Sequence, residues 1–186
     1  MTSLNSKTRI SGRVTAVVFD ENGEIKRFKP KWYERFLGLK GRLMIVTNHN
    51  IVTDEGDALI ADNMANTPAK TKVNNANGYI EVGTGFTSET KSVLSCVTPT
   101  GSTEPMDSTY PILKGSFGAA NDNVTIYRST FEAGDLNATG IDEAALLNNA
   151  TAASAECLAY AQISPAVDVS SSDTLQITWE LTFLGS

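Results

Sequence analysis

Hydrophobic and polar residues alternate most regularly near the end of the chain, over residues 173–183 (DTLQITWELTF). Every second position in this segment is apolar: Leu175, Ile177, Trp179, Leu181 and Phe183. A period of two is that of a β-strand that packs one face on a core and exposes the other face to water. The segment therefore predicts a strand with one buried face.

Shorter apolar segments predict further strands, at residues 13–20, 25–28, 42–48, 79–82, 92–97, 123–131 and 157–163. Asn22-Gly23 separates the first two and favours a tight hairpin, because both residues tolerate positive φ. The continuous apolar run 42–48 is typical of a strand that is buried on both faces. Segments rich in turn residues, such as TPTGSTEP (98–105), separate the other strands.

Many short strands with turn residues between them are typical of an all-β sandwich or barrel. We therefore expect a mainly β fold. Its predicted form is an antiparallel, jelly-roll-like β-sandwich with one short helix and an N-terminal arm or hairpin.

The expected helix covers residues 54–66. Thr53 can cap it, acidic residues occupy its first turn, and Pro68 follows its end. Ile60 and Met64 are spaced to stack on its inward side.

Two other segments bear on helix content. Residues 32–38 (WYERFLG) are compatible with a second, short helical turn. The Ala-rich segment 143–156 has helical propensity, but its Asn and Ser residues favour a short strand followed by a loop.

Length and composition fit one domain of ordinary size. The chain has 186 residues, of which 41% are hydrophobic and 19% charged, so a sizeable core can form without disulfides or metals. No apolar run approaches the roughly 18 residues that span a bilayer, and the first residues (MTSLNSKTRISG) are polar. We therefore expect no membrane segment and no secretory signal, and we expect Cys96 and Cys157 to be buried, reduced thiols.

Charge is distributed unevenly along the chain. Residues 1–45 hold ten Lys or Arg and four acids, a net charge of +6, whereas the rest holds five basic and seventeen acidic residues, a net charge of −12. Residues 26–42 (KRFKPKWYERFLGLKGR) contain seven basic residues, one Glu and four of the fourteen aromatic residues. Such asymmetry indicates a polyanion or an acidic protein surface as partner. We predict two parts: a basic aromatic N-terminal arm or hairpin extension, residues 1–42, and a β-sandwich domain, residues 43–186.

No group of residues predicts a catalytic centre or a metal site. His49 is the only histidine, and no Cys lies near it in the sequence. Asp142 and Glu143 are adjacent, and adjacent residues of a strand point to opposite faces, so we expect a solvated surface unless a bulge brings them together. The turn GTGF (83–86) lacks the third Gly of a dinucleotide site and is typical of the end of a strand. The sequence thus predicts a protein that is not an enzyme and that binds no cofactor.

The basic aromatic segment allows three interpretations, which we rank in this order. In the first, its rings are anchors in the surface of another protein, and acids of that protein surround the basic side chains. In the second, it is a solvated loop whose rings fill the edge of the domain. In the third, it binds nucleic acid through phosphates and stacked bases. The acidity of the rest of the chain disfavours the third interpretation. The predicted interface residues are Arg27, Phe28, Lys29, Lys31, Trp32, Tyr33, Arg35 and Phe36.

Three segments resemble small virion proteins of tailed bacteriophages, of the kind described as tail-fibre or head-decoration proteins. The segments are YIEVGTG (79–85), VTIYRSTFEAGDLNATGIDEAALLN (124–148) and CLAYAQISPAVDVSSSDTLQITWELTF (157–183). The resemblance covers roughly residues 43–186 and leaves out residues 1–42. It is one of strands and turns and contains no catalytic signature. It implies a role in assembly of the virion and implies no cofactor.

The combined expectation is a non-enzymatic structural protein of a bacteriophage virion. Its expected role is that of a capsid decoration or cement protein, which stabilises the particle by bridging neighbouring subunits. The alternative in the same class is a tail, collar or fibre component. An alternative of another class is a carbohydrate- or receptor-binding module that uses rings such as Tyr110 or Tyr127. The expected partners are the major capsid protein or tail proteins, together with further copies of the chain; a membrane or nucleic acid is not expected.

Overall fold

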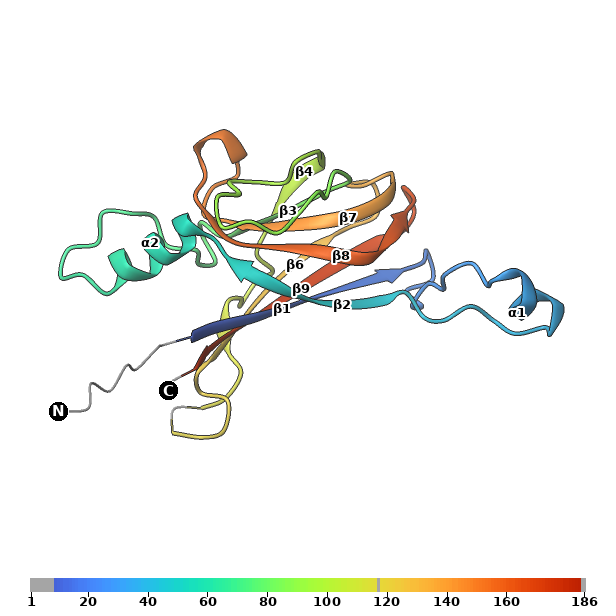
Figure 1. Cartoon of the computed structure of the whole chain (residues 1–186), viewed down its shortest axis with the longest axis horizontal. Coiled ribbons are helices and arrows are strands. Elements are labelled where there is room, and N and C mark those ends of the chain that lie inside the picture. Colours follow the sequence, from blue (N-terminus) through green and yellow to red (C-terminus); the bar gives the residue numbers. More distant parts are fainter. Residues whose placement is uncertain (1–8, 117, 185–186) are drawn as a thin grey trace.

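The computed structural model describes residues 9–116 and 118–184, and its main feature is one antiparallel sheet of nine strands in the order β4-β3-β7-β8-β2-β1-β9-β6-β5 (Figure 1). The strands are β1 (Arg9–Phe19), β2 (Ile45–Val52), β3 (Tyr79–Gly83), β4 (Pro99–Pro105), β5 (Ile112–Leu113), β6 (Val124–Phe131), β7 (Ala138–Leu147), β8 (Cys157–Val169) and β9 (Thr174–Leu184). The helices are α1 (Trp32–Phe36), α2 (Asp54–Asn63) and the short 3-10 helix η1 (Ala152–Ser154). None of these helices is long and apolar enough to cross a membrane, a finding that covers the described residues.

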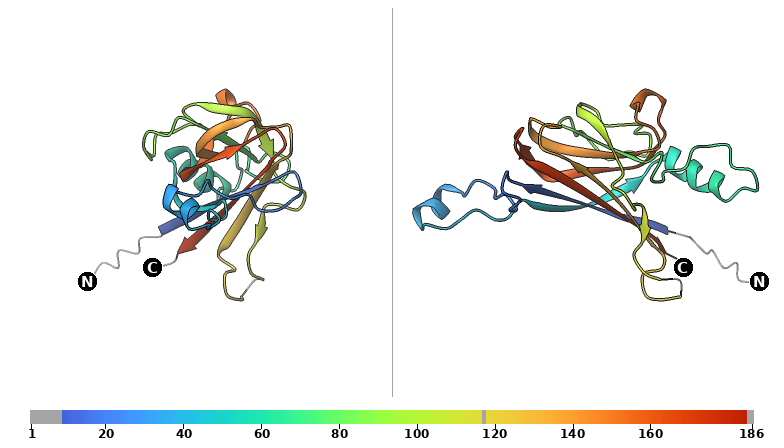
Figure 2. Two further views of the ribbon diagram at one scale, coloured as in Figure 1. Left: turned by 90° about the vertical axis from the view of Figure 1, so that its right-hand side faces the viewer. Right: turned by 180° about the vertical axis from the view of Figure 1, so that it is seen from behind.

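The sheet curls over on itself, so that its two halves form two layers around one main core (Figure 2). The curl brings the segment of β4 against β6, although the two are not neighbours in the sheet. The Asp107 N–H donates to the Arg128 carbonyl at 2.8 Å, and the Ser129 hydroxyl donates to the Glu104 carbonyl at 3.2 Å. This arrangement confirms the predicted fold class, which is mainly β, antiparallel and sandwich-like.

Several predicted segments form the expected strands. The alternating segment near the end of the chain is β9; its four apolar residues from Leu175 to Leu181 are buried, and Phe183 packs partly buried against the main core. The hairpin at Asn22-Gly23 is also confirmed, since Gly23 has a φ of +76° and its N–H donates to the Asp20 carbonyl at 2.9 Å. Strands β3, β6 and β8 lie at predicted segments as well.

Three strand predictions are wrong. The segment 25–28 forms no strand and pairs only through isolated bridges, Ile25 with Phe19 and Arg27 with Leu43. Residues 92–97 are irregular, and the strand of this region is β4, which occupies most of the segment predicted as a turn. The run 42–48 was expected to be buried on both faces, but β2 is buried on one face: Val46 is 4% exposed and its neighbour Ile45 is 42% exposed. The physical reason is that alternate side chains of β2, from Ile45 to His49, face solvent on the outer side of the sheet.

Helix α2 begins as predicted but ends earlier and packs through a different side. Thr53 Oγ1 accepts the N–H of Gly56 at 2.9 Å, which confirms the cap. Leu59 is the buried anchor, and Ile60 packs partly buried against the main core as predicted. Met64 lies beyond the helix and is 85% exposed, so the prediction is wrong for this residue. Gly56 determines the inward side, because a Cβ there would lie 2.1 Å from the Leu158 carbonyl oxygen.

The other two segments that were considered for helix content agree with their interpretation from the sequence. Residues 32–38 contain the short helix α1. The Ala-rich segment 143–156 forms the end of β7 and then a loop with η1, so the interpretation as a strand followed by a loop is confirmed.

An irregular segment, residues 84–98, lies over the outer face of the sheet, and we call it the cover loop. Its Phe86 ring stacks on the Tyr160 ring with a centroid separation of 6.1 Å. A second apolar cluster therefore forms between the cover loop and the sheet; its buried members are Cys96, Ala145, Leu147, Cys157 and Tyr160. Both cysteines are free and buried, as predicted.

The predicted arm, residues 1–42, divides into parts with different roles. Residues 1–8 lie outside the described residues. Strand β1 pairs with both β2 and β9 in the middle of the sheet, so it is part of the domain and not an extension of it. Residues 20–44, between β1 and β2, leave the sheet and project from the end of the molecule opposite α2 (Figure 1). We call these residues the projecting loop.

Candidate functional site

The projecting loop has a closely paired neck that holds its two sides together. The Phe28 N–H donates to the Arg42 carbonyl at 2.9 Å, and the Arg27 guanidinium donates to the Gly41 carbonyl at 2.9 Å. The Arg42 guanidinium lies 4.7 Å from the centroid of the Phe28 ring, which packs partly buried against the main core. Gly41 is required in the neck, because a Cβ there would lie 1.8 Å from the Phe28 carbonyl oxygen.

Helix α1 lies at the far end of the projecting loop and has no buried residue (Figure 1). Glu34 fixes its start by accepting the Lys31 N–H at 2.6 Å, and Gly38, with a φ of +67°, follows its end. The apolar side chains of this turn face solvent: Trp32 is 81% exposed and Phe36 is 86% exposed. We call the exposed apolar residues of this region the aromatic tip; they are Trp32, Tyr33, Phe36, Leu37 and Leu39.

Four basic side chains surround the aromatic tip. Lys29, Lys31, Arg35 and Lys40 are exposed, and within the described part of the chain they form no ion pair. Lys26, at the base of the loop, differs because it pairs with Asp173. The positive charge of the tip is therefore directed to solvent beside the exposed rings.

The eight predicted interface residues separate into two groups. Arg27 and Phe28 belong to the neck and hold the loop in shape. The other six lie in or beside the aromatic tip: Lys29, Lys31, Trp32, Tyr33, Arg35 and Phe36. Leu37 and Leu39 were missed. Their apolar character was visible in the sequence, but a leucine of a β-rich chain is ordinarily a core residue.

Glu143 is a fully buried carboxylate, so the prediction of a solvated surface at this position is wrong. A β-bulge interrupts β7 after Ile141. Because Ile141 and Ala144 both face the main core although they are three residues apart, the bulge directs Asp142 and Glu143 together to the outer side. Glu143 accepts hydrogen bonds from the N–H groups of Gly85, Val97 and Thr98 at 2.9 to 3.0 Å and from the Tyr160 hydroxyl at 2.5 Å.

Close contacts with Glu143 and with Thr98 explain the two glycines of the turn GTGF. A Cβ on Gly83 would lie 2.4 Å from Glu143 Oε1, and a Cβ on Gly85 would lie 2.3 Å from Thr98 Oγ1. Asp142 contributes a further bond, from the Phe86 N–H at 3.1 Å. The two acids therefore fasten the cover loop to the sheet, and the turn lies at the end of β3, as predicted.

The other buried ionisable groups beneath the cover loop are also occupied by internal contacts. Glu81 accepts the Cys96 N–H at 2.7 Å, and burial raises the pKa of its carboxyl. Burial raises the pKa of the Cys157 thiol to about 12 and that of Cys96 well above its ordinary value. Thiols with such pKa values stay protonated and are poor nucleophiles near neutral pH.

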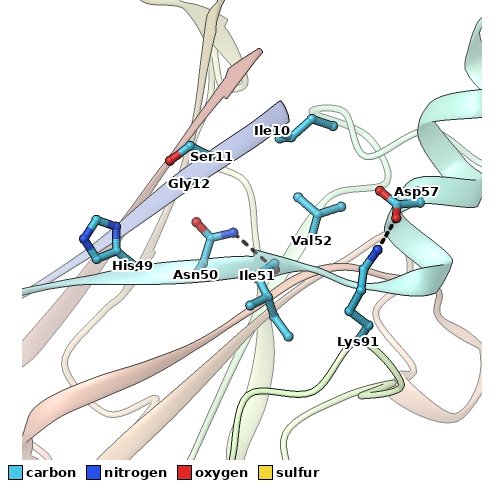
Figure 3. Close-up of a pocket in the computed structure, with 9 residues that line it drawn as sticks. All are labelled: Ile10, Ser11, Gly12, His49, Asn50, Ile51, Val52, Asp57 and Lys91. Atoms are coloured by element: carbon cyan, nitrogen blue, oxygen red, sulfur yellow. Dashed lines mark hydrogen bonds and ion pairs between the residues drawn. The ribbon is translucent and has the colours of Figure 1, made fainter. Parts of the chain in front are cut away.

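A shallow groove lies beside α2, and β1, β2 and the cover loop contribute to its lining (Figure 3). The Asp57–Lys91 ion pair bounds one side of the groove. His49 is exposed on the other side, and its imidazole makes no hydrogen bond within the described ranges. Asn50 Oδ1 is buried without a hydrogen-bond partner, next to Gly12, where a Cβ would lie 1.7 Å from it. In this groove, nothing positions His49 as an acid or a base.

The two tyrosines considered for carbohydrate binding do not present free rings. Tyr127 is 9% exposed, and burial raises the pKa of its hydroxyl to about 12. The Tyr110 ring is partly buried, and the Arg128 guanidinium lies 4.3 Å from its centroid. These positions do not support a carbohydrate platform built on these two rings.

Within residues 9–116 and 118–184, no three or more His, Cys, Asp or Glu side chains are grouped so that they could hold a metal ion. Comparison with protein-family models, with curated proteins and with solved structures finds no match for this chain. The candidate site that emerges from the geometry is the aromatic tip of the projecting loop.

Proposed function

We propose that this chain is a non-enzymatic structural protein of a bacteriophage virion, which joins the particle by burying its aromatic tip in the surface of another protein. The favoured role is decoration or cementing of the capsid, and a position in the tail, collar or fibre is the alternative. The observation that carries the proposal is the tip itself, with Trp32 81% and Phe36 86% exposed at the end of an ordered projection. The resemblance of residues 79–85, 124–148 and 157–183 to virion proteins supports the proposal that the particle is a bacteriophage virion.

The aromatic tip has the composition of a binding surface. Clustered exposed apolar side chains on a folded protein usually mark an interaction site. Trp and Tyr are enriched among the residues that dominate interface energies, and removal of one such anchor costs about 2 kcal/mol, or about 30-fold in affinity. The neck orders the loop before a partner arrives, so less conformational entropy is lost on binding than for a flexible arm.

The basic residues around the tip define the chemistry of the partner. Lys29, Lys31, Arg35 and Lys40 are free to meet carboxylates at the rim of an interface. Rim charges act mainly on the rate of association and are screened by salt. The proposed partner is therefore a protein surface with an apolar pocket and acidic residues around it.

The test is attachment of an excess of the protein to particles that lack it, so that each copy can contact further copies as well as the particle. A double variant, Trp32→Ala with Phe36→Ala, should bind these particles about 100-fold more weakly or worse, because it loses both anchors. The matched control is Leu113→Ala, which truncates a side chain that is 57% exposed on β5, far from the tip in the sequence. The control should bind as the wild type does, and all three proteins should have the same melting temperature.

Two outcomes would contradict the proposal. One is equal attachment of the double variant and the wild type. The other is binding of the wild type to DNA at physiological salt that is lost in the double variant, since that result would favour the nucleic-acid interpretation. Electron micrographs of particles that carry labelled protein would distinguish head from tail.

A further inference from the structure

We infer that the protein that receives the aromatic tip is a second copy of this chain, and that the tip docks on the opposite end of that copy. The inference rests on the proposed function, because it specifies the partner of the same tip. The receiving area, which we call the acidic surface, consists of the first turn of α2 and the outward side of the cover loop. Its exposed residues are Asp54, Asp57, Glu89, Leu94 and Val97. Glu55 does not belong to it, because its carboxylate is partly buried and accepts the Cys157 N–H at 2.7 Å.

The acidic surface is continuous because the cover loop is fastened to α2. The Asp54 N–H donates to the Lys91 carbonyl at 2.8 Å, and the Lys91 ammonium pairs with the Asp57 carboxylate. The Gln162 N–H donates to Glu89 Oε1 at 3.2 Å, which holds the cover loop on β8. The acids of α2 and Glu89 are therefore held together by the cover loop, and the exposed Leu94 and Val97 follow further along the same loop.

The charge and the apolar area of this face complement those of the tip. The side chains of Asp54 and Asp57 are 70% and 50% exposed, and Lys91 is the basic residue paired with them. Leu94 and Val97 are 57% and 53% exposed on the cover loop. The projecting loop thus presents bases around exposed rings, whereas α2 and the cover loop present acids and exposed aliphatic side chains.

The opposite pairing, tip against tip, brings like charges together. Residues 26–42 hold seven basic residues and one Glu, so two tips in contact would repel each other. The tip and α2 lie at opposite ends of the long axis of the molecule (Figure 1). A contact between two different surfaces at opposite ends is heterologous, and its repetition builds a ring or a filament of copies.

The available area is sufficient for a specific contact. A buried aromatic side chain covers roughly 150–250 Å², so Trp32 and Phe36 together supply roughly 300 Å². Tyr33, Leu37, Leu39 and the stems of the basic side chains add to this. The total approaches the roughly 800 Å² that each partner contributes to an interface of standard size.

A mixing experiment in sedimentation velocity tests the inference without particles. The tip variant carries Trp32→Asp and Phe36→Asp, and the surface variant carries Asp57→Lys and Leu94→Lys, all at exposed positions. The wild type should associate increasingly with concentration, and less at high salt. Each variant alone should stay monomeric. Their equimolar mixture should form a dimer and nothing larger, because one intact tip and one intact acidic surface remain.

Three outcomes would overturn the inference. In the first, the surface variant associates as strongly as the wild type. In the second, the mixture stays monomeric although the wild type associates. In the third, the wild type is monomeric at about 1 mM, so that its binding is weaker than about −4 kcal/mol. If any of these occurs and the tip variant still fails to join particles, the tip binds a different virion protein and the proposed function stands. Circular dichroism of both variants controls for folding.

Discussion

Glu143 connects three parts of the chain that lie far apart in the sequence. Its carboxylate receives N–H groups from both ends of the cover loop, at Gly85 and Thr98, and the hydroxyl of Tyr160 on β8. A buried carboxylate costs little when donors surround it and costs much when they are absent. Glu143 accepts three N–H groups of the cover loop, so it is a main attachment of that loop to the sheet.

Removal of this carboxylate should destabilise the protein strongly. Glu143→Ala leaves several buried donors without an acceptor, and we expect the free energy of unfolding to fall by about 4 kcal/mol. The matched control is Asp142→Ala, which removes one N–H partner, that of Phe86, and should cost about 1 kcal/mol. Urea unfolding measures both values. Equal losses in the two variants would show that Glu143 has no special role.

Glu104 should make stability depend on pH. Burial, together with Asp135, Asp107 and Glu132, raises the pKa of Glu104 from 4.5 to about 7. The folded protein therefore binds this proton more tightly than the unfolded chain, so the stabilisation is complete below about pH 4.5 and is lost as the pH rises through about 7. Glu104→Gln removes this dependence.

We expect Glu104→Gln to be more stable than the wild type at pH 8. The expected gain in the free energy of unfolding is only about 1 kcal/mol, because Glu104 is partly exposed and solvent screens its charge. The two proteins should be equally stable near pH 4. Thermal unfolding at both values of pH measures the difference, and Glu21→Gln, at an exposed position in the hairpin turn, is a control of the same charge change. A gain that is the same at both values would argue against titration as its cause.

At the scale of elements, the sequence predicts those parts that have a regular period. Strand β9 and the hairpin at Asn22-Gly23 follow from local patterns, and both are found. The sequence could not show that the strand of this region is β4 and not residues 92–97. Val93 and Cys96 are apolar because they pack the cover loop against the sheet, and not because they belong to a strand. The bulge that buries Glu143 also leaves no local signal, since the bonds that satisfy it come from distant segments.

The projecting loop was predictable in composition but not in shape. The basic and aromatic residues of its tip stand out in the sequence, whereas the division into a neck and a tip depends on pairing across the loop. Because this pairing holds the loop and few of its side chains reach the main core, the neck can be disturbed separately from the sheet.

Gly41→Ala should open the neck and leave the body folded. The added Cβ meets the Phe28 carbonyl, so the two sides of the neck must separate. We expect trypsin to cut the projecting loop several-fold faster, while the free energy of unfolding of the body falls by about 1 kcal/mol. Leu39→Ala, in the same loop but outside the neck, is the control and should be cut at the wild-type rate. An unchanged rate for Gly41→Ala would show that the neck does not order the loop.

At the scale of the whole molecule, the predicted arm is not a separate extension, because it contains β1, which lies in the middle of the sheet. Deletion of residues 1–42 removes a strand from the middle of the sheet, between β2 and β9. We expect this deletion to abolish the cooperative thermal transition. Replacement of residues 29–41 by Asn-Gly keeps β1 and the base of the neck, so this variant should melt within a few degrees of the wild type and lose attachment. A folded deletion protein would contradict the central position of β1.

The pairing of β1 with β9 also has a consequence during synthesis. The two strands align along their whole length, from Arg9 opposite Leu184 to Phe19 opposite Thr174, although they occupy distant positions in the chain. On the ribosome, β1 is made long before β9 and stays without this partner until residues 174–184 have been synthesised. Contacts between such distant residues slow folding, so we expect a chaperone to bind the unpaired edge of β1 until β9 has been synthesised.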